Sequence, residues 1–164
     1  MIRKCAMDGS EDVIIQQIIN DAAQAYKGII PQDRYVEPYM SLIHLQSEMA
    51  DGVVFWGYED EDGLVGVMGI QDKEEVALIR HAYVRTDQRG KGIGSKLLVY
   101  LMDASAKPLL IGTWASASWA ISFYKRNGFK LVEPIDKEHL LRTYWSIPER
   151  QIETSVVLCD PSWM

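Results

Sequence analysis

Several features that would point to a function are scarce or missing in this sequence. Cysteine occurs only at Cys5 and Cys159, and the histidines, His44, His81 and His139, are too scattered to suggest a metal site. No apolar run approaches the roughly 20 residues that span a membrane. With 17 basic against 23 acidic residues, the net charge is -6, and the basic excess typical of nucleic-acid binding is missing. We therefore expect no metal, no membrane and no nucleic acid as partners.

The N-terminal stretch MIRKCAMDGSEDV turns acidic and polar at once, which is not typical of a secretory leader. We therefore expect a reducing, cytoplasmic compartment, in which the two cysteines are small buried hydrophobic residues and not a disulfide. The 164 residues, of which 48% are hydrophobic, suffice for a sizeable core. We expect one domain over residues 1–164.

Hydrophobic periodicity predicts a chain that alternates between strands and helices. The expected elements are a strand at 2–7, a helix capped by Asp8 or Ser10 that runs to about Tyr26, a helix at 39–49, strands at 52–59, 64–71 and 74–85, a helix at 93–102, a strand at 109–114, a helix at 116–129 and a strand at 151–159. Residues 134–148 follow neither period and are expected to be irregular. The order β-α-α-β-β-β-α-β-α-β is typical of an α/β or α+β domain with a mixed sheet.

The stretch VRTDQRGKGIGSKLLVYLM, residues 84–102, places glycines at alternate positions between a predicted strand and a predicted helix. The first turn of a helix has unpaired N–H groups and a partial positive charge, and glycines let a backbone approach an anion closely. Arg89 and Lys91 add positive charge. The string matches neither a P-loop nor a dinucleotide fingerprint. It predicts a phosphate or pyrophosphate site, with a plain glycine-rich connector as the alternative.

Two motifs in this region resemble those of the GNAT acetyltransferase superfamily. QRGKGIG, residues 88–94, contains R-x-x-G-x-G and looks like the loop that binds the pyrophosphate of acetyl-CoA in that family. AISFYKRNGF, residues 120–129, resembles the family motif A-x-x-[FL]-Y-x-x-x-G-F, and an apolar strand separates the two, as in the family. The resemblance is specific over about residues 52–131. It implies a mixed, mostly antiparallel central sheet flanked by helices, with acetyl-CoA as the cosubstrate.

The resemblance also implies roles for individual residues. Backbone groups of Ala82, Tyr83 and Val84 would contact the pantetheine arm, which requires the fourth and fifth strands to splay apart. The amides expected to enclose the pyrophosphate belong to Arg89, Gly90, Lys91, Gly92, Ile93, Gly94 and Ser95. Tyr124 would donate a proton or hydrogen bond to the departing thiolate, and the alternative is that it packs in the core.

One departure from the family and one open choice affect the site. Ala117 stands where the family often has asparagine, so a contact to the pantetheine arm is missing or comes from Ser116 or Ser118, which could equally cap the helix. As the general base we expect Glu75, at the start of the fourth strand. His81, on the same strand, is the second choice because an ordinary histidine titrates near neutral pH. Each of the two could also be an ordinary surface or half-buried residue.

The implied reaction is acetyl transfer from acetyl-CoA to a primary amine by direct attack in a ternary complex. The acceptor, a small molecule or a peptide, is expected between the first two helices, the edge of the fourth strand and the last strand. Tyr26, Tyr35, Glu37 and Tyr39 would lie there, either to hold a cation or to pack. The alternatives are a non-catalytic acyl-CoA-binding regulatory module on the same fold and a structural or interaction protein. A homodimer is left open.

Overall fold

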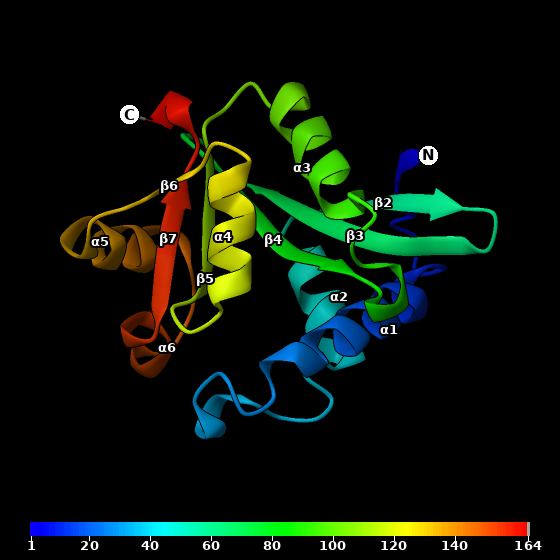
Figure 1. Cartoon of the computed structure of the whole chain (residues 1–164), viewed down its shortest axis with the longest axis horizontal. Helices are drawn as coiled ribbons and strands as arrows, with labels where there is room; N and C mark the ends of the chain where they lie inside the picture. Colours follow the sequence, from blue (N-terminus) through cyan, green and yellow to red (C-terminus); the bar gives the residue numbers. More distant parts are fainter. Residues whose placement is uncertain (164) are drawn as a thin grey trace.

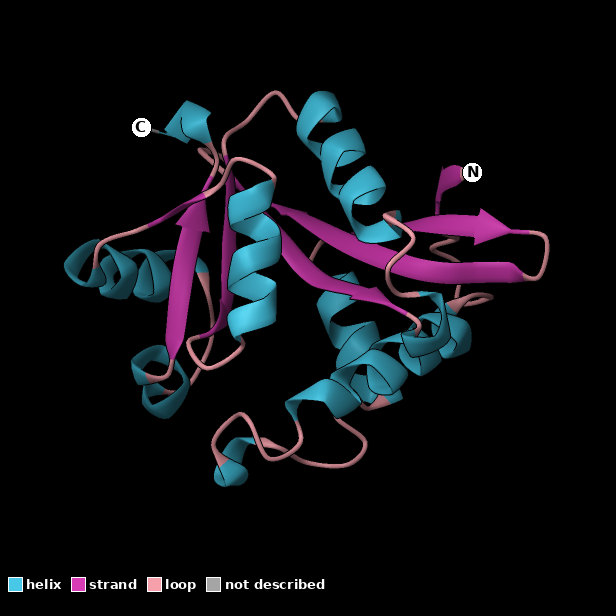
Figure 2. Ribbon diagram, viewed as in Figure 1, coloured by secondary structure: helices cyan, strands magenta, loops and turns pink. Residues whose placement is uncertain are grey.

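The computed structural model of the chain describes residues 1–163 and contains one seven-stranded sheet with helices on both faces (Figures 1 and 2). In space the strands follow the order β1-β2-β3-β4-β5-β7-β6, and only β4 and β5 are parallel neighbours within the described residues. The strands are β1 (Ile2–Lys4), β2 (Val53–Asp60), β3 (Gly63–Asp72), β4 (Ala77–Val84), β5 (Leu109–Trp114), β6 (Lys130–Leu131) and β7 (Ser155–Cys159). This confirms the mixed, mostly antiparallel sheet expected from the sequence.

Six α-helices cover the sheet within the described residues. They are α1 (Asp12–Ala23), α2 (Leu42–Ala50), α3 (Ile93–Ala104), α4 (Ser118–Arg126), α5 (Pro134–Tyr144) and α6 (Glu149–Glu153). Helices α3 and α4 pack on one face, around a core that includes Ile79, Leu98 and Leu158. The other face has two separate helical layers, with α1 and α2 under β2 to β4 and with α5 and α6 against β7 (Figure 1).

The apolar runs that predicted the strands are the buried parts of the sheet. In β2, Val53 and Phe55 are fully buried and alternate with half-exposed neighbours, which is typical of a strand with one covered face. In β5, Leu109, Leu110 and Ile111 are all buried, because helices cover both faces there. The hairpin between β2 and β3 and the helix after the glycine loop are also confirmed.

Two C-terminal segments differ from what the sequence predicts. Residues 134–148, expected to be irregular, contain α5, in which only Leu140 and Leu141 are buried. Two adjacent buried residues form no apolar stripe, so the helix leaves no periodic signal in the sequence. The last strand begins later than expected, at Ser155, because Glu149–Glu153 forms α6.

The predicted helix caps are also wrong at two helices. Helix α1 begins after Glu11, and Asp8 accepts hydrogen bonds from the backbone and hydroxyl of Ser10 instead of from the helix. Helix α4 begins after Ala117, and no serine side chain caps it. Ala117 is fully buried, in a cluster with Tyr26 after α1 and Trp114 at the end of β5.

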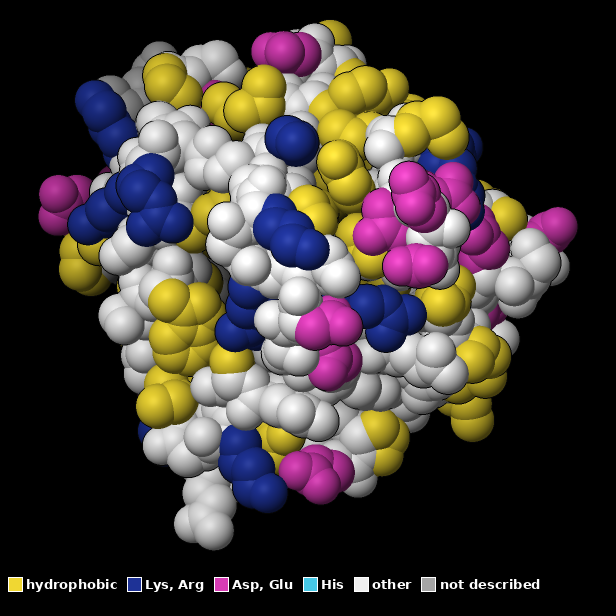
Figure 3. Space-filling model, turned by 45° about the vertical axis from the view of Figure 1, so that its right-hand side comes forward, with side chains coloured by type: hydrophobic (Ala, Val, Ile, Leu, Met, Phe, Trp, Pro, Cys, Tyr) yellow, Lys and Arg dark blue, Asp and Glu magenta, His cyan; other side chains and the backbone are white. Residues whose placement is uncertain are grey.

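Other features bear on the partners expected from the sequence. Cys5 and Cys159 are buried free thiols, as expected. None of the helices in the described part of the chain is both long and apolar enough to cross a membrane. Within residues 1–163, no group of three or more His, Cys, Asp or Glu side chains could hold a metal ion. On the face drawn in Figure 3, basic side chains form small separate groups among acidic ones.

Candidate active site

Strands β4 and β5 are paired along only part of their length. Their parallel pairing runs from Ala77 opposite Leu109 to Ile79 opposite Ile111 and then stops. Beyond this point the two strands diverge and form a V that is visible in Figures 1 and 2. Among the described residues no strand pairs with β4 on this side from Arg80 onward, so the splayed strands inferred from the sequence are present. An unpaired strand edge offers N–H and C=O groups to an extended ligand.

A β-bulge lies where β4 leaves β5. The register with β3 shifts between Arg80 and Tyr83, so two residues of β4 lie opposite one residue of β3. His81, within the bulge, has a φ of 54°, a left-handed conformation in which histidine is found more often than most residues. The bulge interrupts the alternation of side chains, so the neighbours Arg80 and His81 both reach Glu48 on α2.

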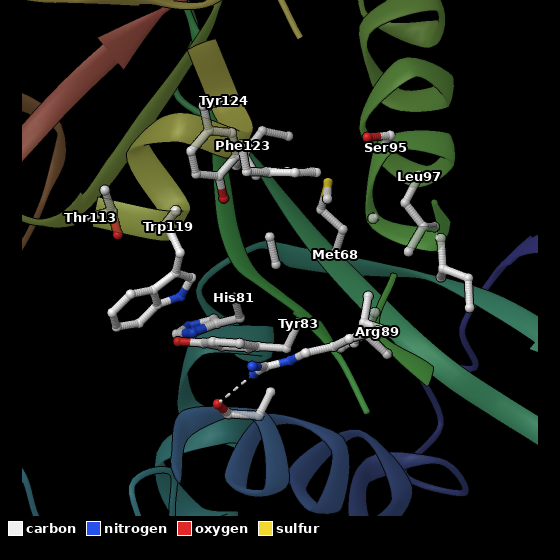
Figure 4. A pocket seen from close by; sticks show the side chains of 18 of the residues that line it. Met68, His81, Tyr83, Arg89, Ser95, Leu97, Thr113, Trp119, Phe123 and Tyr124 are labelled. Carbon is white, nitrogen blue, oxygen red and sulfur yellow. Dashed lines mark hydrogen bonds between the residues drawn. The ribbon is translucent and has the colours of Figure 1, made fainter. Parts of the chain in front are cut away.

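The V opens into a cleft of about 470 Å³ between α1, β4, α3 and α4. The cleft brings together most of the site residues predicted from the sequence: His81, Ala82, Tyr83, Val84, Arg89, Gly90, Gly92, Ile93, Gly94, Ser95 and Tyr124. In Figure 4, Tyr124 and Phe123 lie on one side of this space and His81, Tyr83 and Arg89 on the other. Lys91 and Glu75 are not among the lining residues.

The glycine loop has the conformation that its sequence predicts. Gly90 and Gly92 have φ values of 81° and 76°, and Gly92 is the residue that precedes the first turn of α3. Any side chain at these positions is strained, although no atom lies within 4 Å of the place that its Cβ would take. At Gly94, by contrast, a Cβ would come within 3.3 Å of the Phe123 ring. The glycines thus keep the mouth of the cleft free of side chains.

The backbone amides at the start of α3 are available to an anion. The first hydrogen bond into this helix runs from Lys96 N–H to the carbonyl oxygen of Gly92, at 3.0 Å. The amides of residues 93–95 precede that bond and have no acceptor within the helix. They therefore form the kind of helix N-terminus that binds phosphate groups.

The two cations of the loop differ in position. The Arg89 guanidinium donates to the carbonyl oxygen of Ala22, in the last turn of α1, at 3.2 Å (dashed line in Figure 4). Lys91 is exposed, and its ammonium group donates to the side-chain oxygen of Gln88 at 2.8 Å. Arg89 therefore carries its charge at the cleft, whereas Lys91 lies outside it.

Tyr124 presents its hydroxyl to the cleft from α4. Its ring packs edge-on against Phe123 and Phe129, and only 6% of the residue is exposed (Figure 4). Burial raises the pKa of Tyr124, with a smaller contribution from Tyr26, so the phenol stays protonated near neutral pH. The hydroxyl makes no hydrogen bond to any residue in the described range. Tyr124 thus packs its ring in the core and leaves its hydroxyl free to donate a hydrogen bond in the cleft.

Ala117 and its neighbouring serines add nothing to the cleft. Ala117 is fully buried beside Trp114, and neither Ser116 nor Ser118 is among the lining residues. The contact that an asparagine would make from this position is therefore missing.

His81 is hydrogen-bonded to Glu48, a residue for which the sequence gives no local signal. The imidazole Nε2 bonds to Glu48 Oε2, and Arg80 Nη2 donates to Glu48 Oε1 at 2.7 Å. Burial alone would raise the pKa of Glu48, but the hydrogen bond from His81 and the charges of His81, Arg80 and His44 outweigh burial and lower this pKa to about 2. Glu48 is therefore ionised, although only 15% of its side chain is exposed.

Glu75 lies away from the cleft, contrary to the role expected for it. It precedes β4 in the turn after β3, where its carboxylate accepts a hydrogen bond from the Tyr144 hydroxyl at 3.0 Å. The reason is the pairing of β4: its first residues are joined to β5, and the cleft opens only beyond Ile79.

Aromatic residues close the cleft on the side of α1. The hydroxyls of Tyr26 and Tyr83 are 3.2 Å apart, and the Tyr39 hydroxyl accepts a hydrogen bond from the Trp114 indole at 3.0 Å. Burial raises the pKa of Tyr26, and it raises the pKa of Tyr39 to about 12. Of the four residues expected around an acceptor, only Tyr26 lines the cleft, and the side chain of Glu37 is 64% exposed.

A second cavity, of about 460 Å³, lies between α2, the start of β4 and the end of α5. Its charged and titratable lining residues are His44, Glu48, Asp51, Lys73, Arg80 and Tyr144. Glu48 borders this cavity and His81 borders the cleft, so their hydrogen bond stands between the two spaces.

Comparisons with known proteins agree with this geometry. Residues 51–131 match the model of the acetyltransferase (GNAT) domain family. UPF0157 protein YqkA from Bacillus subtilis is 27% identical over 113 residues, which are 66% of this chain; the chain spans about a third (32%) of the length of that relative. The matched family segment contains both the glycine loop and the motif around Tyr124.

Two crystal structures extend the likeness over nearly the whole chain. PaiA N-acetyltransferase from Thermoplasma acidophilum, in complex with coenzyme A, has a TM-score of 0.72 at 18% identity and covers 98% of this chain and 97% of its own. Ribosomal-protein-alanine N-acetyltransferase from Brucella melitensis has a TM-score of 0.66 at 18% identity and covers 98% of both chains. Residues 51–131 thus match the GNAT acetyltransferase domain family, and the remaining elements complete the fold of these N-acetyltransferases.

Proposed function

We propose that this chain is an acetyl-CoA-dependent N-acetyltransferase that moves an acetyl group to a primary amine by direct attack in a ternary complex. One observation carries the proposal: a single cleft holds an anion-binding helix N-terminus, an unpaired strand edge and a free phenol. These are the parts needed to hold a long thioester cosubstrate and to assist the departure of its thiolate.

The cleft fits acetyl-CoA in three respects. The free amides of residues 93–95, with Arg89 beside them, suit a pyrophosphate. The unpaired edge of β4, at Ala82, Tyr83 and Val84, suits the amide groups of a pantetheine arm, which would lie there like another strand. No atom lies near the Cβ positions of Gly90 and Gly92, so the loop leaves room for the ligand. The coenzyme A complex of the Thermoplasma acidophilum relative supports this assignment.

Tyr124 is the proposed acid. When the amine nitrogen attacks the thioester carbonyl, a carbon–nitrogen bond forms and the carbon–sulfur bond breaks. The departing sulfur takes a proton or a hydrogen bond from the Tyr124 hydroxyl, which burial keeps protonated. The free position of this hydroxyl in the cleft supports the role (Figure 4).

His81 is the proposed base, in place of Glu75. The attacking amine must lose one proton, and His81 is the titratable side chain of β4 that lines the cleft and also has a carboxylate partner. Glu75 is hydrogen-bonded to Tyr144 outside the cleft. Transfer should become faster toward alkaline pH, because an alkylammonium group with a pKa near 10.4 is only slightly deprotonated at neutral pH.

A panel of acceptors tests the proposal. The purified chain would be incubated with acetyl-CoA and polyamines, an aminoglycoside, lysine peptides and a peptide with N-terminal alanine. The last is included because one structural relative is a ribosomal-protein-alanine N-acetyltransferase. Matched alcohols serve as controls, and both thiol release and the mass of the product are measured.

We expect thiol release and N-acetylation with at least one amine and none with the alcohols. Tight binding of acetyl-CoA without transfer to any amine would favour the non-catalytic regulatory module, and acetylation of alcohols alone would defeat the amine acceptor. His81→Asn should remove the acidic limb of the pH–rate profile, whereas Glu75→Gln should change the rate little. Asparagine is chosen because it tolerates the left-handed conformation of position 81.

A further inference from the structure

The carboxylate of Glu48 is divided between two groups of partners. Oε2 faces His81, whereas Oε1 accepts hydrogen bonds from Arg80 Nη2 at 2.7 Å and from His44 Nε2 at 3.3 Å. Arg80 and Glu48 are largely buried, with 19% and 15% of their side chains exposed. One oxygen is therefore anchored from the second cavity, and the other is directed at the imidazole that lines the cleft.

A chain of hydrogen bonds fixes this anchor. Arg80 Nη1 donates to the side-chain oxygen of Gln71 at 2.9 Å, and Gln71 is 1% exposed. The amide group of Gln71 donates in turn to the backbone and side-chain oxygens of Asp51, at 3.0 and 3.1 Å. Arg80 cannot swing away from Glu48 without breaking these bonds, so the carboxylate is held in one orientation.

The hydrogen bond to Glu48 decides which nitrogen of His81 carries a proton. Glu48 is ionised, and a carboxylate can only accept hydrogen bonds, so Nε2 of His81 must be the donor. In the neutral imidazole the other nitrogen, Nδ1, then has a free lone pair. The rings of Phe55 and Tyr83 lie roughly parallel to the imidazole, with centroids 6.1 and 6.4 Å away.

Other titratable groups face this pair from each neighbouring element. They are His44 and Asp51 on or next to α2, Arg80 and Tyr83 on β4, Lys73 in the turn before β4, Tyr144 on α5, and Tyr26 after α1. Arg80 and Lys73 are cations that would oppose a charge on His81, and Glu48 is the acid that contacts the ring directly.

We propose that Glu48 is a positioning residue for the transfer reaction: it holds His81 in the Nε2–H tautomer, leaves Nδ1 as the proton acceptor, and stabilises the imidazolium that forms. This rests on the proposed function. In the step, one proton passes from the amine nitrogen to Nδ1 as the carbon–nitrogen bond forms, Nε2 keeps its proton, and Glu48 stays ionised. The imidazolium later returns its proton to the Tyr124 oxygen or to solvent.

Glu48→Gln tests the role with little change of shape. The amide can turn its NH₂ group toward His81 and favour the other tautomer, and the charge that stabilises the imidazolium is gone. We expect kcat to fall by about 10²-fold, the loss typical of a misplaced general base. The acidic limb of the pH–rate profile should move to lower pH, because the imidazolium loses the carboxylate that stabilises it. Acetyl-CoA should bind as it does to the wild type.

Two further variants serve as controls. Glu48→Asp should recover part of the rate. Glu138 is an exposed glutamate of α5, and Glu138→Gln is the matched control.

A readout that needs no acceptor separates this inference from the proposed function. Heteronuclear NMR of histidine-labelled protein reports the tautomer of each ring, and His81→Asn identifies the His81 signals among those of the three histidines. We expect the Nε2–H tautomer in the wild type and a change of tautomer in Glu48→Gln. A neutral His81 that carries its proton on Nδ1 in the wild type would overturn the inference, whatever the enzyme assays give. So would an unchanged pH–rate profile in Glu48→Gln. If His81 has the expected tautomer but no amine is acetylated, the proposed function fails and only the positioning by Glu48 stands.

Discussion

The two sides of the opening between β4 and β5 are built in different ways. On the α3 side, the groups proposed to bind the cosubstrate are backbone amides from one continuous stretch, and glycines give that stretch its shape. On the side of α1 and α2, the groups are side chains from separate elements: Glu48 from α2, His81 from the β4 bulge and Tyr26 after α1. The first side is local in the sequence, whereas the second exists only in the folded chain.

This difference predicts how each side responds to change. A backbone site depends on a few allowed conformations, so a single side chain in the wrong place removes binding altogether. A side-chain network is held by several hydrogen bonds, so one substitution alters pH dependence and stability and leaves the cosubstrate site intact. We expect the largest effect from a substitution on the α3 side, a smaller one from a substitution on the α2 side, and the narrowest one at Tyr124, which faces both.

The largest effect is expected for Gly92→Asp. In the wild type, both acetyl-CoA and free CoA should raise the thermal midpoint, and a ligand at a hundredfold its dissociation constant adds about 2.7 kcal/mol, or about 5 to 10 °C. Aspartate at position 92 introduces a side chain and a negative charge where the pyrophosphate would lie. We expect no shift with either ligand and no measurable turnover.

Gly28→Asp is the matched control for this substitution. Gly28 has a φ of 77°, close to the 76° of Gly92, and no atom lies within 4 Å of its Cβ position either. The strain and the added charge are therefore the same, but Gly28 does not line the cleft. If Gly28→Asp removes the ligand-induced shift as well, or if Gly92→Asp keeps it, the loop is not the pyrophosphate site.

The same contrast explains which parts of the molecule the sequence could predict. The hairpin, the loop glycines and the helix after them depend on residues within one or two turns of each other, and these were placed correctly. The structure places Glu75 outside the cleft, and the sequence could not show this because the cleft begins where the pairing of β4 with β5 ends. That point is set by the bulge and by contacts with β3, and neither leaves a pattern along β4.

Glu48 shows a second limit of the sequence. It is 33 residues from His81, on a helix whose own spacing suggests only a surface glutamate paired with His44 one turn earlier. Its burial and its bond to His81 follow from how α2 packs beneath β4. The sequence did not predict α5 for a related reason, because its two buried leucines are covered only when α5 packs against β7.

On the α2 side, acid should weaken the fold through Glu48. The pKa of this carboxyl is about 2 in the folded chain, against an ordinary value of 4.5, so the unfolded chain binds more protons between these values. The stabilisation is complete above about pH 5 and is lost as the pH falls toward 2. It amounts to at most about 3 kcal/mol. Urea unfolding at a series of pH values should therefore give a flatter curve for Glu48→Gln than for the wild type.

The exposed Glu138→Gln variant should follow the wild-type curve over the same range. Equal slopes for the wild type and Glu48→Gln would mean that Glu48 is not held ionised by its partners. In that case the hydrogen bonds around Glu48 would stabilise its charge no more than a surface ion pair does, and the α2 side would not differ from the surface in this respect.

The smallest effect on structure, and the narrowest effect on function, is expected for Tyr124→Phe. The substitution keeps the ring packed against Phe123 and Phe129 and removes only the hydroxyl, which has no hydrogen-bond partner among the described residues. The hydroxyl is needed when the thiolate leaves and not when the cosubstrate binds, so its loss belongs to the transition state. We expect kcat to fall by about 10²-fold, the lower end for a general acid, because water can take its place. The CoA-induced thermal shift should be unchanged, and Tyr100→Phe on the outer side of α3 should leave both quantities alone. Wild-type turnover in Tyr124→Phe would mean that this residue only packs in the core. A lost thermal shift would mean that its hydroxyl helps to bind the cosubstrate.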